Sequence, residues 1–254
     1  MIRFLPRPLQ VVLFYLMLVW LGSMLLAGNL VTLTLIGVPR SVREPIVQRC
    51  ISLICRVFLD GCEHLGFMRL DLAALDRLNR REPVVLTPNH PSMIDAFLIL
   101  SRVHSAVCLM KASISSNLFL GAGAYLAGYI PNRRPERMFR AAIRTVKSGT
   151  PLLIFPEGTR TTHPPVNAFQ GAAALIARKA NAPLQTIVIT TDSPYLCKGW
   201  KLWRPPVFPL CYRVVPGPRI LVDGSVDALT ARLQAYFEAE LSTTPAARQP
   251  GQRP

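Results

Sequence analysis

The first forty residues constrain the fold of this chain more than any other part of the sequence. Residues 8–39 carry no charged side chain, whereas Arg3 and Arg7 precede them and Arg40 and Arg43 follow. A helix crosses the apolar core of a bilayer with about 20 residues, so a stretch of 32 is more than sufficient. It is also longer than the apolar region of a secretory signal peptide. Residues 1–40 therefore predict an uncleaved hydrophobic membrane anchor.

This anchor is expected to be either one helix or a helical hairpin. Gly22 and the pair Gly28-Asn29 are positions where a helix can break into two shorter ones that dip into one leaflet and return. The flanking arginines are balanced, so the positive-inside rule does not set an orientation. The basic remainder of the chain favours the cytoplasmic face of the inner (cytoplasmic) membrane.

Residues 41–80 are expected to form an amphipathic helical segment. From Glu44 to Leu59 apolar residues recur at helical spacing, with Arg49 and Arg56 among them. A basic amphipathic helix of this kind lies along lipid headgroups, but the same spacing suits a helix packed on a domain core. Both interpretations stay open at this point.

Short apolar runs alternate with helical patterns over residues 81–242. Strands are expected at 84–86, 106–109, 152–155 and 187–189. Helices are expected at 94–103, 115–126, 135–148, 168–180 and 226–241. This alternation predicts an α/β domain with a mixed, mostly parallel sheet flanked by helices. Residues 243–254 are rich in Pro, Gln and Arg and predict a disordered tail.

The charge balance predicts an anionic partner. The chain has 29 Lys and Arg against 14 Asp and Glu, a net charge of +15, which suits nucleic acid or a membrane with anionic lipids. The low aromatic content and the lack of a nucleic-acid motif argue against nucleic acid. The six cysteines include no C-x-x-C pair, so neither a disulfide framework nor a metal site is expected.

A histidine and an aspartate follow the first expected strand, in Asn89-His90-Pro91-Ser92-Met93-Ile94-Asp95. Pro91 disfavours helical angles at His90 and suits the first position of a helix. His90 is therefore expected just outside the helix, with Asp95 one turn inside and its carboxylate within reach of the imidazole. Such a pair can take the proton from an attacking hydroxyl. By itself the His-x4-Asp spacing also fits a helix-capping aspartate.

A second motif, Phe155-Pro156-Glu157-Gly158-Thr159-Arg160, follows another expected strand. Gly158 lets the backbone approach a ligand closely, and the Arg160 guanidinium suits phosphate oxygens. Glu157 would orient that arginine or hold an acceptor hydroxyl. The alternative is a tight turn closed by a Glu157–Arg160 ion pair. Between the motifs, Gly128 and the pair Arg133-Arg134 suggest either a further phosphate site or solvated surface charge.

Together these motifs resemble the glycerol-phosphate and lysophospholipid acyltransferase family, in particular the 1-acylglycerol-3-phosphate acyltransferases. The resemblance covers about residues 83–189. It matches N-H-x-x-x-x-D at 89–95 and F-P-E-G-T-R at 155–160 fully, and a third block more loosely at Gly128 and Arg133. Lys111 corresponds to a lysine that commonly follows the family's second strand.

The resemblance implies a site and a reaction. His90 would be the base and Asp95 its orienting partner. The substrate-binding residues would be Asn89, Lys111, Arg133, Glu157, Gly158, Thr159 and Arg160. The acyl donor would be acyl-CoA or acyl-carrier protein, and the acceptor a lysophospholipid. No metal, no cofactor and no covalent acyl-enzyme are implied.

Departures from the family pattern leave the acceptor open. Ser113 stands where an acidic residue is frequent, residues 169–171 lack the usual basic side chain, and Thr186 replaces a proline. The expected reaction is acylation of lysophosphatidate (1-acylglycerol-3-phosphate) to phosphatidate. The alternative is the same chemistry on an ornithine-type lipid or a pigment head group, because residues 198–203 resemble a branch found beside specialised-lipid and aryl polyene pathways. A non-catalytic anionic-lipid binding module is a third possibility, although such a module has no need of His90 and Asp95.

Overall fold

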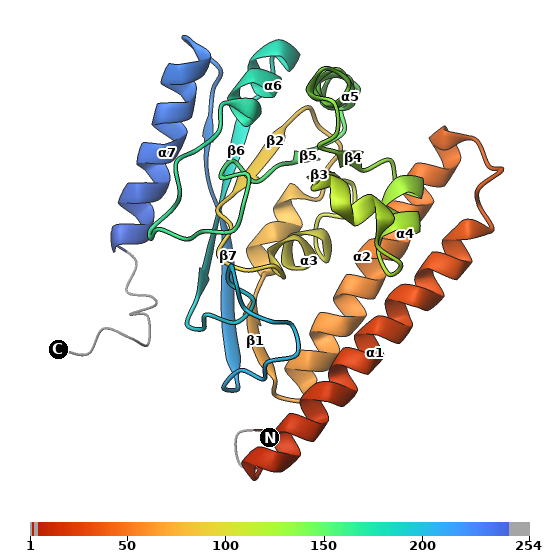
Figure 1. The fold of residues 1–254 in the computed structure, drawn as a ribbon. Helices are drawn as coiled ribbons and strands as arrows, with labels where there is room; N and C mark the ends of the chain where they lie inside the picture. The colour runs from red at the N-terminus through yellow and green to blue at the C-terminus, as the bar shows by residue number, and fades with distance from the viewer. Residues whose placement is uncertain (1, 3–4, 244–254) are drawn as a thin grey trace.

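A seven-stranded sheet forms the centre of the protein (Figure 1), which a computed structural model describes for residue 2 and residues 5–243. The strand order is β1-β7-β6-β2-β5-β3-β4. Neighbouring strands pair in parallel, with the exception of the antiparallel pair β6–β7. The strands are β1 (Met68–Asp71), β2 (Val85–Pro88), β3 (Val107–Met110), β4 (Ile130–Pro131), β5 (Leu152–Leu153), β6 (Leu184–Thr191) and β7 (Leu210–Ile220). The mixed, mostly parallel sheet predicted from the sequence is confirmed.

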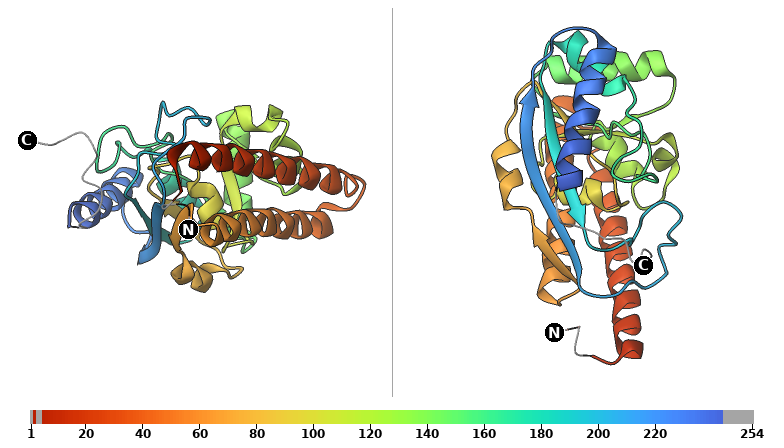
Figure 2. Two further views of the ribbon diagram at one scale, coloured as in Figure 1. Left: turned by 90° about the horizontal axis from the view of Figure 1, so that it is seen from below. Right: turned by 90° about the vertical axis from the view of Figure 1, so that its left-hand side faces the viewer.

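Helices cover both faces of this sheet (Figures 1 and 2). They are α1 (Arg7–Leu33), α2 (Arg40–His64), α3 (Asp95–Leu100), α4 (Gly121–Leu126), α5 (Pro135–Lys147), α6 (Ala172–Ala180) and α7 (Val226–Thr243), with short 3-10 helices η2 (Ala73–Leu78) and η3 (Ala112–Ser116). Alternate strand residues point to opposite faces, so Leu86 packs with α1, α2 and α3, while Val85 packs with α5, α6 and α7. The buried strands therefore read as continuous apolar runs in the sequence.

The N-terminal helix α1 is continuous over 27 residues, so of the two alternatives the structure has the single helix, without a break at Gly22 or at Gly28-Asn29. Gly28 instead lets α1 approach Ile54 of α2, because a Cβ atom at this position would collide with that side chain. Asn29 is buried, and its amide bonds to Leu118 O and Gly123 N. The hairpin that does form is larger than expected: α1 and α2 run side by side (Figure 2), with the turn between Leu33 and Arg40.

The helical segment predicted over 41–80 ends earlier in the structure. Its helix is α2, which is followed by β1 inside the predicted segment, and β1 pairs with β7 from Met68 onward. The predicted boundary at residue 81 therefore cuts through the α/β domain. The helix predicted at 115–126 is divided between η3 and α4, and α7 extends to Thr243. The predicted tail from 244 onward lies outside the described residues.

Strand β7 escaped prediction because it contains Pro216 and Pro218. Proline is tolerated in a sheet mainly at edges, where its missing N–H leaves no ladder bond unmade. Only Leu210–Arg213 of β7 pair with the short strand β1, so the two prolines lie where β7 has an open edge on that side. The length of β1 thus explains how a proline-containing segment serves as a strand.

Candidate active site

The two chemical motifs of the sequence meet at the carboxyl ends of two neighbouring strands. Strands β2 and β5 are neighbours, with Val85 opposite Leu152 and Leu86 opposite Leu153. The first motif leaves the carboxyl end of β2 and the second leaves the carboxyl end of β5. Ligands of open α/β sheets bind outside the carboxyl ends of the strands, so this end of the sheet is the expected position of a site.

His90 and Asp95 form a hydrogen-bonded pair, as predicted. His90 Nδ1 lies 2.8 Å from Asp95 Oδ2, and the backbone N–H of Ser92 donates to the same oxygen at 2.8 Å. Asp95 is the first residue of α3, so it lies at the helix start and not one turn inside, and Pro91 precedes the helix. With Nδ1–H directed at the carboxylate, Nε2 is the ring nitrogen available to accept a proton.

One face of the His90 imidazole is stacked on an aromatic ring. The rings of His90 and Phe155 are stacked, with centroids 3.9 Å apart and planes inclined by 24°. The His90 side chain is 18% exposed, whereas that of Asp95 is fully buried. The His90 ring is thus fixed in orientation and still partly exposed.

Asp95 is a costly residue for the fold. Burial raises the pKa of its carboxyl group above the ordinary value of 3.8, and the hydrogen bonds from His90 and Ser92 act in the opposite direction. Its second oxygen, Oδ1, has no hydrogen-bond partner within the described part of the chain. Native proteins rarely leave a buried polar atom unpaired, and such exceptions concentrate at functional sites. The geometry thus favours a chemical role for this residue.

The Glu157 side chain forms hydrogen bonds with other residues of the protein. Its buried carboxylate accepts hydrogen bonds from the backbone N–H of His90 at 2.8 Å, from the Thr161 hydroxyl at 2.9 Å and from the N–H of Asn167 at 2.9 Å. These bonds join the second motif to the backbone of the base. The structure therefore gives Glu157 a positioning function, where the sequence suggested contact with the acceptor or an ion pair with Arg160.

We expect replacement of Glu157 by glutamine to lower kcat about 10- to 100-fold, with little change in KM for the acceptor. The amide would turn an NH2 group toward donors that now meet a carboxylate, which shifts the backbone of His90. Steady-state kinetics with varied acceptor concentration measure the two constants. Glu136→Gln, on a side chain that is 90% exposed, is the control. A large rise in KM with kcat unchanged would instead show that Glu157 binds the acceptor.

Arg160 supports a neighbouring loop. Its Nη1 donates to the carbonyl oxygens of Leu196 and Cys197, both at 2.9 Å. The turn before it contains Gly158, whose φ of +67° favours glycine, and both Gly158 and Thr159 are exposed. A guanidinium has five N–H donors, so Arg160 retains donors for a ligand while it holds the loop.

The remaining predicted residues divide into one buried and two exposed. Asn89 is buried and forms a pair of bonds with the backbone of Ile189, which fixes the end of β2 against β6. Lys111 and Arg133 are exposed and follow β3 and β4, which pair at Met110 and Pro131. The strand order puts both cations on the side of β5 away from β2. Both cations thus lie at the carboxyl ends of the parallel strands, as the two motifs do.

Sequence reasoning missed the contribution of the segment between β6 and β7. The Ser92 hydroxyl donates to Tyr195 O at 3.0 Å and lies 3.4 Å from the Tyr212 hydroxyl. The N–H of Met93 donates to Leu196 O at 3.0 Å. Nothing in the local sequence indicates these contacts, because their partners are about 100 residues away along the chain.

Comparison with known proteins agrees with this geometry. Residues 69–190 match the family model described as Acyltransferase, a span that contains both motifs. Residues 69–190, just under half of the chain, thus form an acyltransferase domain, and the relatives similar to it are described as 1-acyl-sn-glycerol-3-phosphate acyltransferases. The chain is 27% identical over 129 residues to the chloroplastic 1-acyl-sn-glycerol-3-phosphate acyltransferase of Brassica napus, which covers 48% of the chain and 38% of that protein. An Arabidopsis thaliana chloroplastic enzyme of the same description is 24% identical over 129 residues, covering 48% of the chain and 36% of the relative. The matched segments are thus well under half the length of these relatives.

The same fold occurs in a solved acyltransferase structure. The crystal structure of the 1-acyl-sn-glycerophosphate acyltransferase from Thermotoga maritima superposes with a TM-score of 0.73 at 18% identity, covering 93% of this chain and 97% of that one. The likeness extends over nearly the whole described chain and so includes α1 and α2. The fold of this chain is therefore shared with a solved structure over most of its length.

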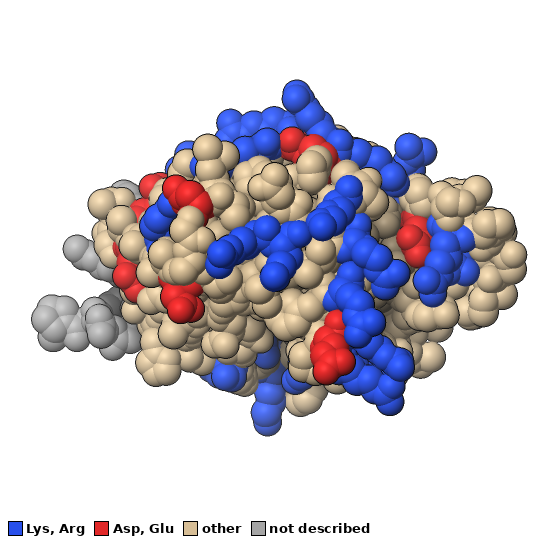
Figure 3. Space-filling view, turned by 90° about the horizontal axis from the view of Figure 1, so that it is seen from above, with Lys and Arg blue, Asp and Glu red and all other residues tan. Residues whose placement is uncertain are grey.

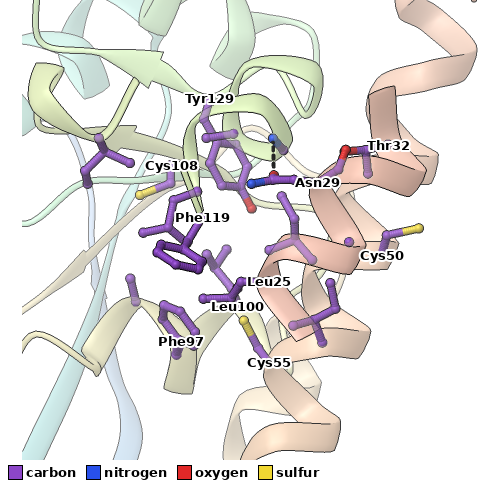
Figure 4. Close-up of a pocket in the computed structure, with 18 of the residues that line it drawn as sticks. Leu25, Asn29, Thr32, Cys50, Cys55, Phe97, Leu100, Cys108, Phe119 and Tyr129 are labelled. Atoms are coloured by element: carbon purple, nitrogen blue, oxygen red, sulfur yellow. Dashed lines mark hydrogen bonds between the residues drawn. The ribbon is translucent and has the colours of Figure 1, made fainter. Parts of the chain in front are cut away.

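The acyltransferase has an apolar cavity of about 130 Å³ between α1, α2, α3 and α4 (Figure 4). Phe97 and Leu100 of α3, the helix that begins at Asp95, form part of its wall. Tyr129 and Phe119 face them, and Asn29 closes one end through its bond to Gly123 N. A cavity of similar size, about 150 Å³, admits benzene when its lining is apolar. It therefore has room for a few methylene groups.

Proposed function

We propose that this acyltransferase transfers a fatty-acyl group from acyl-CoA or acyl-carrier protein to the free hydroxyl of lysophosphatidate, giving phosphatidate. The observation that carries the proposal is the His90–Asp95 pair, held at the carboxyl end of β2 with Nε2 directed away from the carboxylate. The relatives described as 1-acyl-sn-glycerol-3-phosphate acyltransferases support the choice of acceptor.

In the proposed mechanism the acceptor hydroxyl attacks the thioester carbonyl directly. His90 Nε2 takes the hydroxyl proton as the new C–O bond forms, and Asp95 stabilises the imidazolium. When the tetrahedral intermediate collapses, the C–S bond breaks and His90 returns the proton to the departing thiolate. The reaction needs no serine or cysteine nucleophile, because the acceptor itself supplies the attacking oxygen.

The acceptor phosphate is proposed to bind among Lys111, Arg133 and the remaining donors of Arg160. All three lie on segments that follow strands at the same sheet edge. The face of the molecule over α5 and α6 adds a general positive field, since basic side chains outnumber acidic ones there (Figure 3). Arginine forks and lysine ammonium groups are the usual partners of phosphate oxygens.

The acyl chain of the donor is proposed to enter the apolar cavity beside α3. Filling the cavity with Cys55→Phe is expected to shift donor preference toward shorter chains, by about tenfold in the ratio of kcat/KM values. Cys55→Ala, which enlarges the cavity, is the matched variant and is expected to leave or extend the accepted length. Rates with a series of acyl-CoA chain lengths test this. If both variants prefer the same acyl-chain length in the donor, the acyl chain binds elsewhere.

The catalytic domain is proposed to act at the cytoplasmic face of the inner membrane. Helix α1 is long and apolar enough to cross a membrane by length and composition. It is also hydrogen bonded to the folded body near both ends, through Tyr15 and Asn29. We therefore propose that α1 lies along one leaflet, since a helix held in this way cannot leave the domain to cross the bilayer.

The direct test uses full-length protein purified in detergent. It is incubated with lysophosphatidate and a radiolabelled acyl thioester, either acyl-CoA or acyl-carrier protein, and the products are separated by thin-layer chromatography. Labelled phosphatidate is the expected product. No transfer to lysophosphatidate, combined with transfer to an ornithine-type lipid or another hydroxyl, would retain the chemistry and replace the acceptor. No transfer from either donor to any of these acceptors would contradict the proposal.

A further inference from the structure

The segment between β6 and β7, residues 192–209, has an apolar tip that the proposed reaction does not use. Leu202, Trp203 and Val207 are 41%, 62% and 78% exposed. Apolar side chains clustered on a surface mark a site of contact with a partner or a membrane more often than a chance arrangement. We call this segment the tip loop.

The base of the tip loop is fixed to both catalytic motifs. Arg160 of the second motif donates to two of its carbonyl oxygens, those of Leu196 and Cys197. Ser92 and Met93 of the first motif donate to the carbonyl oxygens of Tyr195 and Leu196. The position of the tip is therefore set relative to His90 by bonds from each side of the site.

The outer part of the tip loop packs on α1. The Tyr15 hydroxyl donates to Trp203 O at 3.2 Å. The fully buried ring of Phe14 lies 6.0 Å from the ring of Phe208 and 6.1 Å from that of Tyr195. The tip loop and the N-terminal half of α1 thus form one surface.

A second loop, residues 117–120 between η3 and α4, lies along the same side of α1. Tyr15, Gly22 and Asn29 are seven residues apart, which is close to two helical turns, so they form a line along the helix. Tyr15 contacts the tip loop, a Cβ atom at Gly22 would lie 3.7 Å from the Phe119 ring, and Asn29 donates to Leu118 O at 2.8 Å. Leu118 and Phe119 are themselves exposed.

The exposed stripe of α1 borders both loops. Its apolar members recur at intervals of three and four residues and include Leu9, Val12, Leu16, Val19 and Leu30. Helix stripe and loops together give an apolar face built from three separate parts of the chain. A single helix that spanned a bilayer would not require the two loops to share this face.

The tip loop carries basic groups as well. Residues 192–209 include Lys198, Lys201 and Arg204, all exposed, and one acidic residue, Asp192, which lies at the base of the loop and accepts a hydrogen bond from Cys211 N. The Arg204 guanidinium lies over the Trp200 ring, 4.6 Å from its centroid. Tryptophan, lysine and arginine beside exposed apolar side chains are the composition of segments that lie at the boundary between headgroups and acyl chains. Anionic headgroups attract each such cation.

We propose that the tip loop is a second membrane-binding element, which inserts Leu202, Trp203 and Val207 into the interface of a bilayer that contains anionic phospholipids. The α1 stripe and the pair Leu118-Phe119 lie in the same plane, and the three cations contact the headgroups. Because the base of the loop is bonded to both motifs, this contact sets the height of the active site above the bilayer.

The test is vesicle binding by the full-length protein, which does not depend on the acceptor. Sedimentation is measured with vesicles of phosphatidylcholine alone and of equal parts phosphatidylcholine and phosphatidylglycerol. The variant Leu202→Ala/Trp203→Ala/Val207→Ala is expected to reduce the partition coefficient about tenfold on both. The variant Lys198→Gln/Lys201→Gln/Arg204→Gln is expected to reduce it only on the anionic vesicles, with a weaker salt dependence. Leu221→Ala, at an exposed position after β7, is the matched control.

A second measurement locates the loop without relying on binding strength. Brominated lipids quench tryptophan that enters the bilayer, so Trp203→Phe should remove more of the quenchable emission than Trp200→Phe, whose ring is half-buried. Unchanged partitioning together with equal quenching in these two variants would overturn the proposal. So would self-association in solution that disappears in the triple alanine variant, because the tip would then be an interface between two copies of the chain.

Discussion

Replacing His90 by alanine is expected to lower the rate of acyl transfer by about 10²- to 10⁴-fold, which is the usual contribution of a positioned general base. In the proposed mechanism the imidazole takes the acceptor proton, and Asp95 Oδ2 lies 2.8 Å from its Nδ1. Single-turnover rates at saturating acceptor and donor measure the effect on the chemical step. Substrate affinity should change little, because the proposed phosphate contacts lie on other residues.

Loss of activity in His90→Ala has a structural explanation that must be separated from the chemical one. Alanine leaves the buried Asp95 carboxylate without its main partner, which is expected to cost about 1–3 kcal/mol of stability. His90→Asn is the matched variant, because its amide can still donate near the position of Nδ1 while no atom replaces Nε2. It should be as inactive as alanine and closer to the wild type in its melting temperature. An acyl-transfer rate within tenfold of wild type in His90→Asn would show that His90 is not the general base.

Asp95→Asn is expected to reduce kcat by about 10³- to 10⁴-fold, as in hydrolases whose histidine loses its carboxylate partner. The amide keeps an acceptor for the Ser92 N–H, but it no longer stabilises the imidazolium. The side chain is fully buried, so water cannot substitute for the missing charge. Rates measured beside those of Asp71→Asn, a 61% exposed aspartate paired with Arg213, test this. A loss smaller than tenfold would contradict the assigned role.

The same substitution should leave the fold at least as stable at neutral pH. Since burial raises the pKa of Asp95 in the folded protein, its contribution to stability is full below the ordinary value of 3.8 and is lost as pH rises through the raised value. Asparagine does not titrate and avoids this loss. The melting temperature of Asp95→Asn relative to wild type is therefore expected to increase from acid to neutral pH. The opposite trend would show that the ionised carboxylate stabilises the fold.

The His90–Asp95 pair was readable from the sequence because its two residues are close together in the chain. His90 and Asp95 are five residues apart, and the proline between them keeps the histidine out of the helix. The apolar runs around Val85 and Leu152 likewise predicted buried parallel strands. By contrast, β1 (Met68–Asp71) alternates apolar and charged residues and β4 (Ile130–Pro131) ends in proline, so neither strand stands out as an apolar run.

Glu157 shows where reasoning from the sequence stopped. The neighbouring Arg160 suggested an ion pair or a phosphate site. The Glu157 carboxylate instead accepts a hydrogen bond from the N–H of His90, which is 67 residues away. The tip loop is a similar case, since its bonds to Tyr15 and Ser92 cross about 190 and 100 residues. Contacts over such separations follow from strand order, and strand order has no local signature.

The sequence by itself determined the class of fold and the pairing from which the chemistry is proposed: a histidine beside its carboxylate, two strand-end motifs, an α/β domain and an apolar N-terminal helix. These depend on spacing within a few turns or a single strand, where backbone geometry dictates which side chains can meet. Only the tertiary structure decided that α1 is unbroken, that Glu157 holds the backbone of His90, and that a cavity and an apolar face lie beside the two motifs. Those properties arise from packing between elements that are far apart in the chain. The effect of a glycine, a buried amide or a short strand there depends on which residues of other elements it contacts.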